Sequence, residues 1–237
     1  MLPGIFMGAL LVVVGVFIVL GVRASIRAKK ARDAGLADWA VQAGLVHEDK
    51  GDKDFRKAWS VLPEIPNQGE IHHLMYGEID GTSVTLFRHR YVVSTGQTTM
   101  VIIHWVISSD IPDWPELHLR KRSGFAKMLG ARSNVASDAA FDRHWVIKAK
   151  NPGFAAAMLR PHVMQLLSPT AHGTSPRQHR LASKRLRGWH LLQGKLCAVY
   201  RGGMQPQDLD AAVGNLIAVR EAIANEQQAN QLIGSET

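Results

Sequence analysis

The sequence predicts an α+β protein, in which an N-terminal transmembrane helix and a juxtamembrane helix precede a mainly antiparallel β-sheet domain with packed helices. Three observations predict this class. Residues 5–22 are apolar and uncharged. Several later segments of strand length either alternate between apolar and polar residues or are continuously apolar. Turn dipeptides separate these segments from helix-forming stretches. Strands followed by helices in this arrangement are typical of an antiparallel sheet with helices on it.

The apolar run at residues 5–22 has the length of a membrane span. At about 1.5 Å per residue, such a helix nearly crosses a hydrocarbon core of roughly 30 Å. A cleaved signal peptide would carry Lys or Arg before a shorter apolar core, whereas the first basic residue here is Arg23. We therefore predict a permanent anchor, with residues 1–22 as the transmembrane helix.

The charges that flank this run predict its orientation. Basic residues collect on the cytoplasmic side of a span, because Lys and Arg resist translocation. All of the nearby ones follow the run: Arg23, Arg27, Lys29, Lys30 and Arg32. The sequence thus predicts a single-pass protein of the inner or plasma membrane, with its N-terminus outside and residues 23–237 in the cytoplasm.

Gly4, Gly8 and Gly15 share one face of the predicted span. Glycine is common in membrane helices, which is one explanation of the pattern. The other is close packing against a second helix, since small residues allow two backbones to approach. The second explanation predicts a homo-oligomer that forms through the span.

A helical stalk is predicted at residues 23–44, ending at Gly44, where the chain becomes polar. An antiparallel sheet domain that ends in a helix is predicted to follow over residues 45–168. Its clearest local feature is Asp80-Gly81, which lies between two β-rich runs and is typical of a type I′ hairpin turn.

Residues 100–107 are largely apolar at both odd and even positions, so both faces of a strand formed here would be apolar. This pattern predicts a central strand that is covered on both faces. His104 within it is expected to be a satisfied core histidine rather than a ligand. The stretch "PELHLRKR" is predicted to form an edge strand, because its terminal charges would discourage edge-to-edge pairing.

Residues 123–130 are predicted to form a short helix. Side chains in residues 141–150 alternate between apolar and polar, which predicts a half-buried strand. A helix is expected to follow at once, with Asn151 as its N-cap and Pro152 at its first position. Pro161 must kink this helix or begin a second one.

Residues 169–185 are predicted to form a linker, rich in Ser, Pro and basic residues. Residues 186–237 then contain two short strands about a Gln193-Gly194 turn, and a last amphipathic helix over residues 206–230. We expect this unit to pack on the same domain.

Four stretches occur in order after the apolar run: "ADWAVQAGL", "YGEIDGTSVTLFRHRY", "FDRHWVI" and "NPGFAAAMLRPHVMQLL". Together they resemble an uncharacterised family of bacterial single-pass membrane proteins with a cytoplasmic α+β domain. The resemblance covers residues 37–201 and implies a helical stalk that leads to an antiparallel sheet. The family has no assigned function, so the resemblance implies no activity, cofactor or catalytic residue. This chain is richer in histidines, and in arginines over residues 177–187, than the family pattern.

The chain is basic, with a formal net charge of +8, and no Asp or Glu lies between Asp142 and Asp208. The basic residues in that interval are Arg143, Lys148, Lys150, Arg160, Arg177, Arg180, Lys184, Arg185, Arg187, Lys195 and Arg201. A basic residue held near an anionic leaflet contributes about 1 kcal/mol to membrane attraction. Lipid headgroups are therefore the first candidate partner.

The predicted contact residues lie in and beside the linker: Arg177, Arg180, Lys184, Arg185 and Arg187. Nucleic acid is the second candidate partner for them, although no RNA- or DNA-binding signature accompanies the charge. The remaining alternative is a solvated linker without a dedicated partner.

Candidate chemistry is sparse. His72 or His73 could approach His89 across a strand pair, but no metal-ligand spacing accompanies them, so we predict no metal site. Asp142 and His144 would share a strand face as a base and its orienting group, without a nucleophile nearby. Cys197 lies in a predicted strand and is expected to be buried and inert.

The absence of catalytic and cofactor motifs predicts a protein that is not an enzyme and needs no cofactor. The predicted function is a membrane-anchored interaction or scaffold module, whose basic face lies toward the anionic inner leaflet. The alternative is a membrane-tethered protein that binds nucleic acid through residues 177–187.

Overall fold

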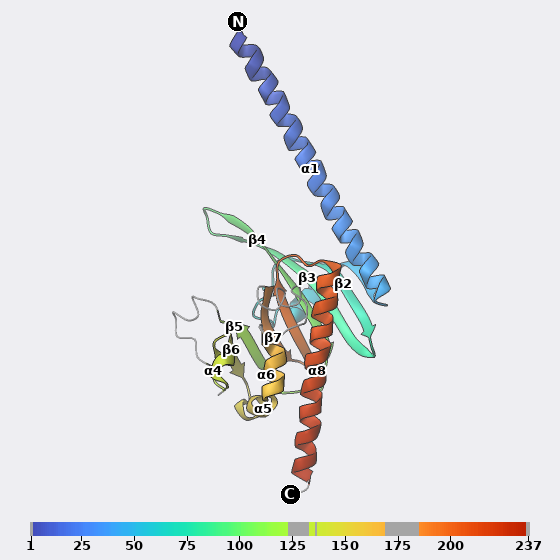
Figure 1. The fold of residues 1–237 in the computed structure, drawn as a ribbon, viewed down its shortest axis with the longest axis vertical. Helices are drawn as coiled ribbons and strands as arrows, with labels where there is room; N and C mark the ends of the chain where they lie inside the picture. Colours follow the sequence, from blue (N-terminus) through green and yellow to red (C-terminus); the bar gives the residue numbers. More distant parts are fainter. Residues whose placement is uncertain (1, 123–132, 136, 169–184, 236–237) are drawn as a thin grey trace.

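A computed structural model gives the fold of the protein. The structure describes residues 2–122, 133–135, 137–168 and 185–235, and it describes side chains from Val19 to Glu226 within these ranges. Figure 1 shows a long N-terminal helix that leads down to a twisted sheet, with a second long helix lying across the sheet and extending beyond it.

One eight-stranded sheet forms the body of the protein, in the order β1-β2-β3-β4-β8-β7-β5-β6. The strands are β1 (Val46–Gly51), β2 (Glu70–Ile79), β3 (Thr82–Ser94), β4 (Thr99–Asp110), β5 (Leu117–Lys121), β6 (Trp145–Ala149), β7 (Leu186–Leu192) and β8 (Lys195–Arg201). All neighbouring strands pair antiparallel. The predicted α+β class with an antiparallel sheet is confirmed.

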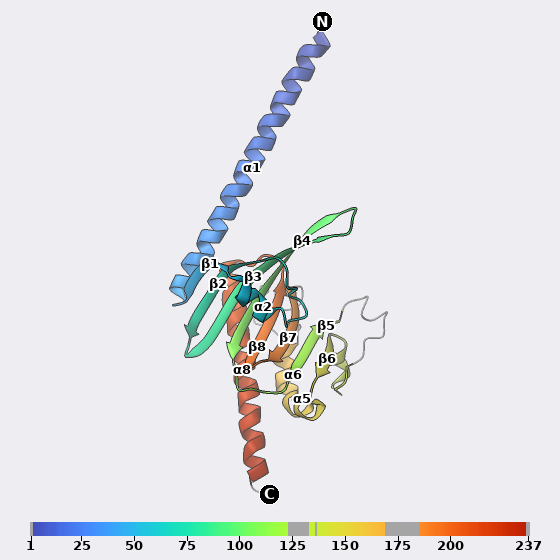
Figure 2. The ribbon, with the colours of Figure 1, turned by 180° about the vertical axis from the view of Figure 1, so that it is seen from behind.

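Helices cover the two faces of this sheet unequally. The helices are α1 (Leu2–Gln42), α2 (Lys53–Trp59), α4 (Ala139–Asp142), α5 (Pro152–Met158), α6 (Pro161–Leu167) and α8 (Pro206–Ser235). The end of α1, together with α5, α6 and α8, packs on one face, where the larger core lies. On the opposite face, α2 and the segment after it cover a smaller core (Figure 2).

Alternation along β4 divides its side chains between the two cores. Trp105 and Ile107 lie in the larger core, and Val106 lies in the smaller one. The prediction of a central strand is confirmed, because β4 pairs with β3 on one side and with β8 on the other. His104 is buried as expected, at 6% exposure, but its Nδ1 has no hydrogen-bond partner among the described residues.

Both predicted hairpin turns are present. Asp80 and Gly81 have φ values of 50° and 71°, and Gln193 and Gly194 have values of 51° and 67°. Two successive positive φ values match the right-handed twist of the flanking strands, which is the type I′ geometry. The break at Pro161 is also confirmed, because it separates α5 from α6.

Two β-bulges interrupt the ladders. In β2, the register shifts between His72 and Met75, and His73 there has a φ of 48°. In β7, the register shifts between Leu186 and Gly188, so that Arg187 is the extra residue. A bulge redirects a side chain that a regular strand would place elsewhere. Each of these two bulges places a basic side chain beside a surface cleft.

The predicted membrane span is the main correction. No helix among the described residues is both long enough and apolar enough to cross a membrane. In the part of α1 whose side chains are described, exposed basic residues recur from Arg23 onward, so this part of the helix is not a continuous apolar segment. The predictions of a single-pass protein, of an N-terminus outside and of inner- or plasma-membrane localisation are therefore wrong.

The glycines of the apolar run, Gly4, Gly8 and Gly15, lie in the part of α1 whose side chains are outside the description. Their packing against a second helix stays a prediction. The same holds for the proposed division into residues 1–22, 23–44, 45–168, 169–185 and 186–237.

Some local predictions were wrong. Strand β5 is not at an edge, because it pairs with both β6 and β7. The strand predicted at 141–150 begins only at Trp145, since Asp138 caps the short helix α4 before it. The polar stretch after α1 forms β1 and α2, for which no strand or helix was predicted. The helix predicted at 123–130 lies outside the described residues.

Candidate anion-binding site

A cleft of about 260 Å³ lies on the sheet face opposite to α8, where β5 and β8 end and β7 begins. We call it the basic cleft, because five of its lining residues are cations. Its lining residues are Glu64, His104, Arg120, Lys121, Arg122, Arg187 and Arg201. A volume of this size suits a small ligand group rather than a whole drug-sized molecule.

Strand pairing brings the cations of the basic cleft together. Arg120 lies opposite Gly188 in the β5–β7 ladder, which places it next to the bulged Arg187. Arg201, the last residue of β8, lies opposite His104 in β4. These residues are distant in sequence, so the cleft exists only once the sheet has formed.

Glu64 provides the carboxylate of the basic cleft. The segment after α2 carries it over the sheet, where it lies 3.2 Å from Nε of Arg120 and 3.0 Å from Nε2 of His190. Glu64 and His190 are close enough to form an ion pair, but their atoms are not oriented for a hydrogen bond. Burial acts to raise the pKa of Glu64, but the adjacent His190 and the charge of Arg120 outweigh it and lower the pKa.

A second histidine extends this contact. Nδ1 of His118 and Nδ1 of His190 are 2.9 Å apart, and His190 is fully buried. Glu64 is thus engaged by Arg120 and His190, and among the described residues it forms no ion pair with Arg187 or Arg201.

Arg187 is repelled by two cations of the cleft, Arg201 and Lys121. Burial and the charge of Arg201 lower the pKa of Arg187, and burial and the charge of Arg187 lower the pKa of Lys121. Among the described residues, no carboxylate lies within 4 Å of Arg187 or Arg201, and the buried Nε of Arg187 has no acceptor. An oxyanion bound here would relieve this repulsion and accept charge-assisted hydrogen bonds.

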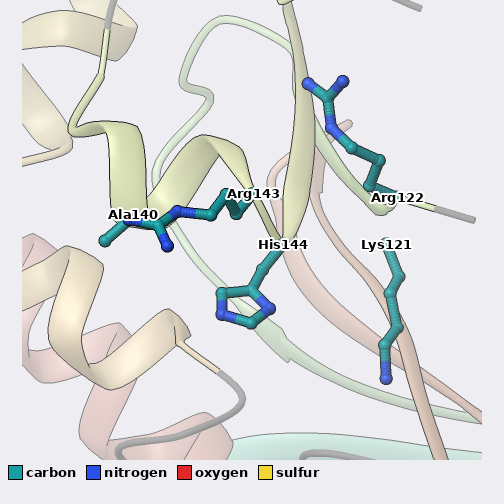
Figure 3. A pocket seen from close by; sticks show the side chains of 5 residues that line it. All are labelled: Lys121, Arg122, Ala140, Arg143 and His144. Carbon is teal, nitrogen blue, oxygen red and sulfur yellow. The ribbon is translucent and has the colours of Figure 1, made fainter. Parts of the chain in front are cut away.

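A neighbouring hollow shares Lys121 and Arg122 with the basic cleft and adds Ala140, Arg143 and His144. Figure 3 shows that these side chains do not converge. Arg122 and Arg143 extend away from His144, while Lys121 runs past it. We therefore regard this hollow as the margin of the basic cleft rather than as a second site.

A larger cleft lies between α1 and strands β1 to β4, and we call it the stalk cleft. It is lined by Lys29, Arg32, Asp33, Asp49, Lys50, Glu70, His72, His73, Arg88, Arg90 and Ile103. Its charges are largely compensated, because Asp33 lies 3.6 Å from Arg88, and Glu70 lies 3.0 Å from His72. This cleft therefore attracts an anion less strongly than the basic cleft does.

His73 links α1 to the sheet. Its Nε2 lies 3.2 Å from Asp33 of α1, its Nδ1 lies 3.2 Å from Nε2 of His47, and its ring stacks on Trp105. Burial, and then the cation of Arg88, lower the pKa of His73 to about 4, although Asp33 acts in the opposite direction. Burial likewise lowers the pKa of His104 to about 4, with Glu64 opposing it.

These two histidines predict an acid-sensitive fold. Their folded pKa values lie below the ordinary value of 6.5, so the unfolded chain binds more protons between pH 6.5 and pH 4. Stability should therefore be highest above pH 6.5 and should fall as the pH decreases toward 4. Urea denaturation across this range measures the effect.

The combined variant His73→Asn and His104→Gln should flatten that pH dependence, since Asn tolerates the positive φ at position 73. The half-exposed His162 provides the control, and His162→Gln should leave the slope unchanged. An unaltered slope in the combined variant would show that other groups cause the acid sensitivity.

The predicted contact residues separate in the structure. Arg187 lines the basic cleft, whereas Arg185 donates to the carbonyl of Gly203 and lies 3.0 Å from Asp208. Arg177, Arg180 and Lys184 lie outside the described residues. The predicted flanking residues Arg23, Arg27, Lys29, Lys30 and Arg32 lie on α1, where Lys29 and Arg32 line the stalk cleft.

Arg120, Lys121 and Arg122 were not among the predicted binding residues. Their signal was present as a run of charges at the end of a strand, and it was interpreted as protection of a sheet edge. Arg201 was noted only as one basic residue of the acid-free interval.

The other chemical candidates do not assemble. The described residues contain no group of three or more potential metal ligands. His72 contacts Glu70, whereas His89 donates to the carbonyl of Gln68 at 2.7 Å. Asp142, the last residue of α4, accepts hydrogen bonds from Ser133 and Ser137, which precede that helix.

Cys197 is fully buried, and burial raises the pKa of its thiol. These properties match the expected buried and inert thiol, because the thiolate is the reactive form and burial disfavours it.

Comparison with known proteins shows a shared fold. The chain matches no protein-family model and no curated protein. It is similar to the crystal structure of the mycobacterial trehalose monomycolate transport factor A, TtfA, with a TM-score of 0.52 and 13% sequence identity, over 81% of this chain and 93% of that chain. The chain thus shares its fold with a mycobacterial protein, and this likeness assigns it to no family.

Proposed function

We propose that this chain is a non-enzymatic interaction module that binds a phosphate-type oxyanion in the basic cleft. The observation that carries the proposal is the convergence of five cations on one small cleft whose carboxylate, Glu64, is already engaged. Arginine forks match the oxygen geometry of phosphate and bind it with charge-assisted hydrogen bonds.

Two further observations support a binding role. Arg187 occupies a β-bulge, a feature often found beside functional sites. The structurally similar TtfA is a transport factor, and transport requires reversible binding. At 13% identity this likeness carries no ligand over to the present chain, so the ligand class rests on the cleft alone.

Pyrophosphate is the simplest probe for this proposal, and calorimetric titration of the full-length chain measures its binding. Each of the variants Arg187→Gln and Arg201→Gln should weaken binding by about tenfold, since a hydrogen bond to a charged group contributes about 1.5–3 kcal/mol. Arg160→Gln is the matched control, because Arg160 is half-exposed in the α5–α6 connection and does not line the cleft.

The source of the phosphate is tested separately with phosphatidylglycerol vesicles and with single-stranded nucleic acid. Weakened vesicle binding by Arg187→Gln and Arg201→Gln would identify a lipid headgroup as the source. Tight binding to nucleic acid that depends on the same two residues would identify nucleic acid instead. Pyrophosphate affinity that is equal in the wild type and in both variants would contradict the proposal.

A further inference from the structure

The hairpin between β3 and β4 extends beyond the sheet as a two-stranded arm. Strand β2 pairs with β3 only as far as Arg90, and β8 pairs with β4 only from His104 onward. Residues 91–102 therefore pair only with each other, and we call them the β-arm. Figures 1 and 2 show the β-arm projecting from the same end of the domain as α1.

The β-arm is uncharged, and its two strands carry exposed apolar residues below a polar turn. Its sequence, "YVVSTGQTTMVI", contains no charged residue. Val92, Met100 and Val101 are 46%, 48% and 52% exposed. Val92 lies opposite Val101, and Val93 lies opposite Met100, so that both faces of the ribbon carry apolar pairs. Exposed apolar surface of this kind marks an interaction site.

Cations surround the base of the β-arm. Arg90 lies opposite Ile103, one pair below the arm, and its side chain is 42% exposed. On the other side of the ladder, Arg201 lies opposite His104, and Arg187 lines the basic cleft with both of them. Exposed apolar pairs on an uncharged arm, with cations at its base, match a surface that has an apolar interior and anionic groups above it.

Other occupants match this arrangement less well. A second copy of the chain would bring the same cations to the contact, and like charges would repel each other. Nucleic acid would satisfy the cations, but its phosphate backbone offers no apolar phase to Val92, Met100 and Val101.

We propose that the β-arm inserts its uncharged turn and the apolar pairs Val92–Val101 and Val93–Met100 into the interfacial region of an anionic lipid surface. The three arginines Arg90, Arg187 and Arg201 then lie at the level of the headgroups. Insertion of the arm rests on the exposure of its apolar residues, and only the headgroup contact rests on the proposed function of the basic cleft. The contact is a peripheral one, made by a hairpin at the surface of the domain.

A fluorophore placed in the β-arm tests this proposal in the full-length chain. The single native cysteine, Cys197, is fully buried, so the variant Met100→Cys can be labelled selectively with a polarity-sensitive nitrobenzoxadiazole. With phosphatidylglycerol vesicles, its emission should increase and shift to shorter wavelength. It should change little with phosphatidylcholine vesicles. Val46→Cys, at an equally exposed valine on the edge strand β1, is the control and should show no shift.

A second experiment adds Val92→Asp and Val101→Asp to the labelled variant. These substitutions should abolish the emission shift, while the pyrophosphate affinity should stay at the wild-type value. Val46→Asp with Val61→Asp is matched to them in residue type and exposure and should leave the shift intact. An unshifted Met100→Cys label would overturn the proposal. So would a shift that survives both aspartates, or a concentration-dependent dimer that the aspartates dissociate. Loss of pyrophosphate binding alone would instead count against the basic cleft.

Discussion

Replacing Trp105 with alanine should lower the free energy of unfolding by about 3–5 kcal/mol. Trp105 is 1% exposed and lies in the middle of the sheet, opposite Arg88 in β3 and Tyr200 in β8. Its ring packs in the larger core and stacks on the ring of His73, with the two ring centroids 6.3 Å apart. The alanine variant would leave a cavity that the surrounding strands cannot close without breaking their register. Chemical denaturation measures the loss.

The same strand offers a matched control for this change. Val101 is 52% exposed in the β-arm, so Val101→Ala should change stability by no more than about 0.5 kcal/mol. Trp105→Phe should be milder than Trp105→Ala, because it keeps most of the apolar volume and removes an indole N–H that has no acceptor among the described residues. Equal stability of the Trp105→Ala variant and the wild type would show that β4 is not the centre of the sheet.

Reversing two charges in the basic cleft should abolish oxyanion binding. The double variant Arg187→Glu and Arg201→Glu removes two charge-assisted donors and adds two carboxylates beside Glu64. Each lost donor corresponds to about a tenfold loss of affinity, and repulsion adds to it. The pyrophosphate affinity should therefore fall by about a hundredfold or more, as measured by calorimetry.

The control for this variant must carry the same change in net charge. Arg23 and Arg27 are exposed on α1 and line neither of the two clefts. Arg23→Glu with Arg27→Glu should therefore weaken pyrophosphate binding only slightly, through long-range electrostatics that salt screens. If both double variants lose affinity equally, binding depends on the total charge of the protein and not on the basic cleft.

Local chemistry made much of the fold predictable from sequence. Asp80-Gly81 and Gln193-Gly194 determine their hairpins because their backbone conformations are restricted to few residue types. Pro161 ends a helix for a steric reason that no neighbour can remove. The apolarity of residues 100–107 on both faces predicted the central strand, and its last residues, Trp105 to Ile107, fill the two cores. Met100 and Val101, which the same pattern predicted to be covered, are exposed.

Long-range features could not be predicted in the same way. The bulges at His73 and Arg187 depend on the register of partner strands, which no local pattern specifies. Glu64 reaches Arg120 and His190 only because the segment after α2 folds back over the sheet. The apolar run at residues 5–22 led to the opposite error, in which a local pattern was interpreted as a span that the described helices do not provide.

The most direct test of the basic cleft is to observe its arginines during binding. The Nε–H signals of Arg187 and Arg201 can be assigned in ¹H–¹⁵N spectra by comparison with the variants Arg187→Lys and Arg201→Lys, and followed as pyrophosphate is added. Our account predicts that these two signals shift and saturate together, while those of Arg23 and Arg27 stay in place. Shifts that are absent at Arg187 and Arg201, or that spread equally over the exposed arginines, would contradict it.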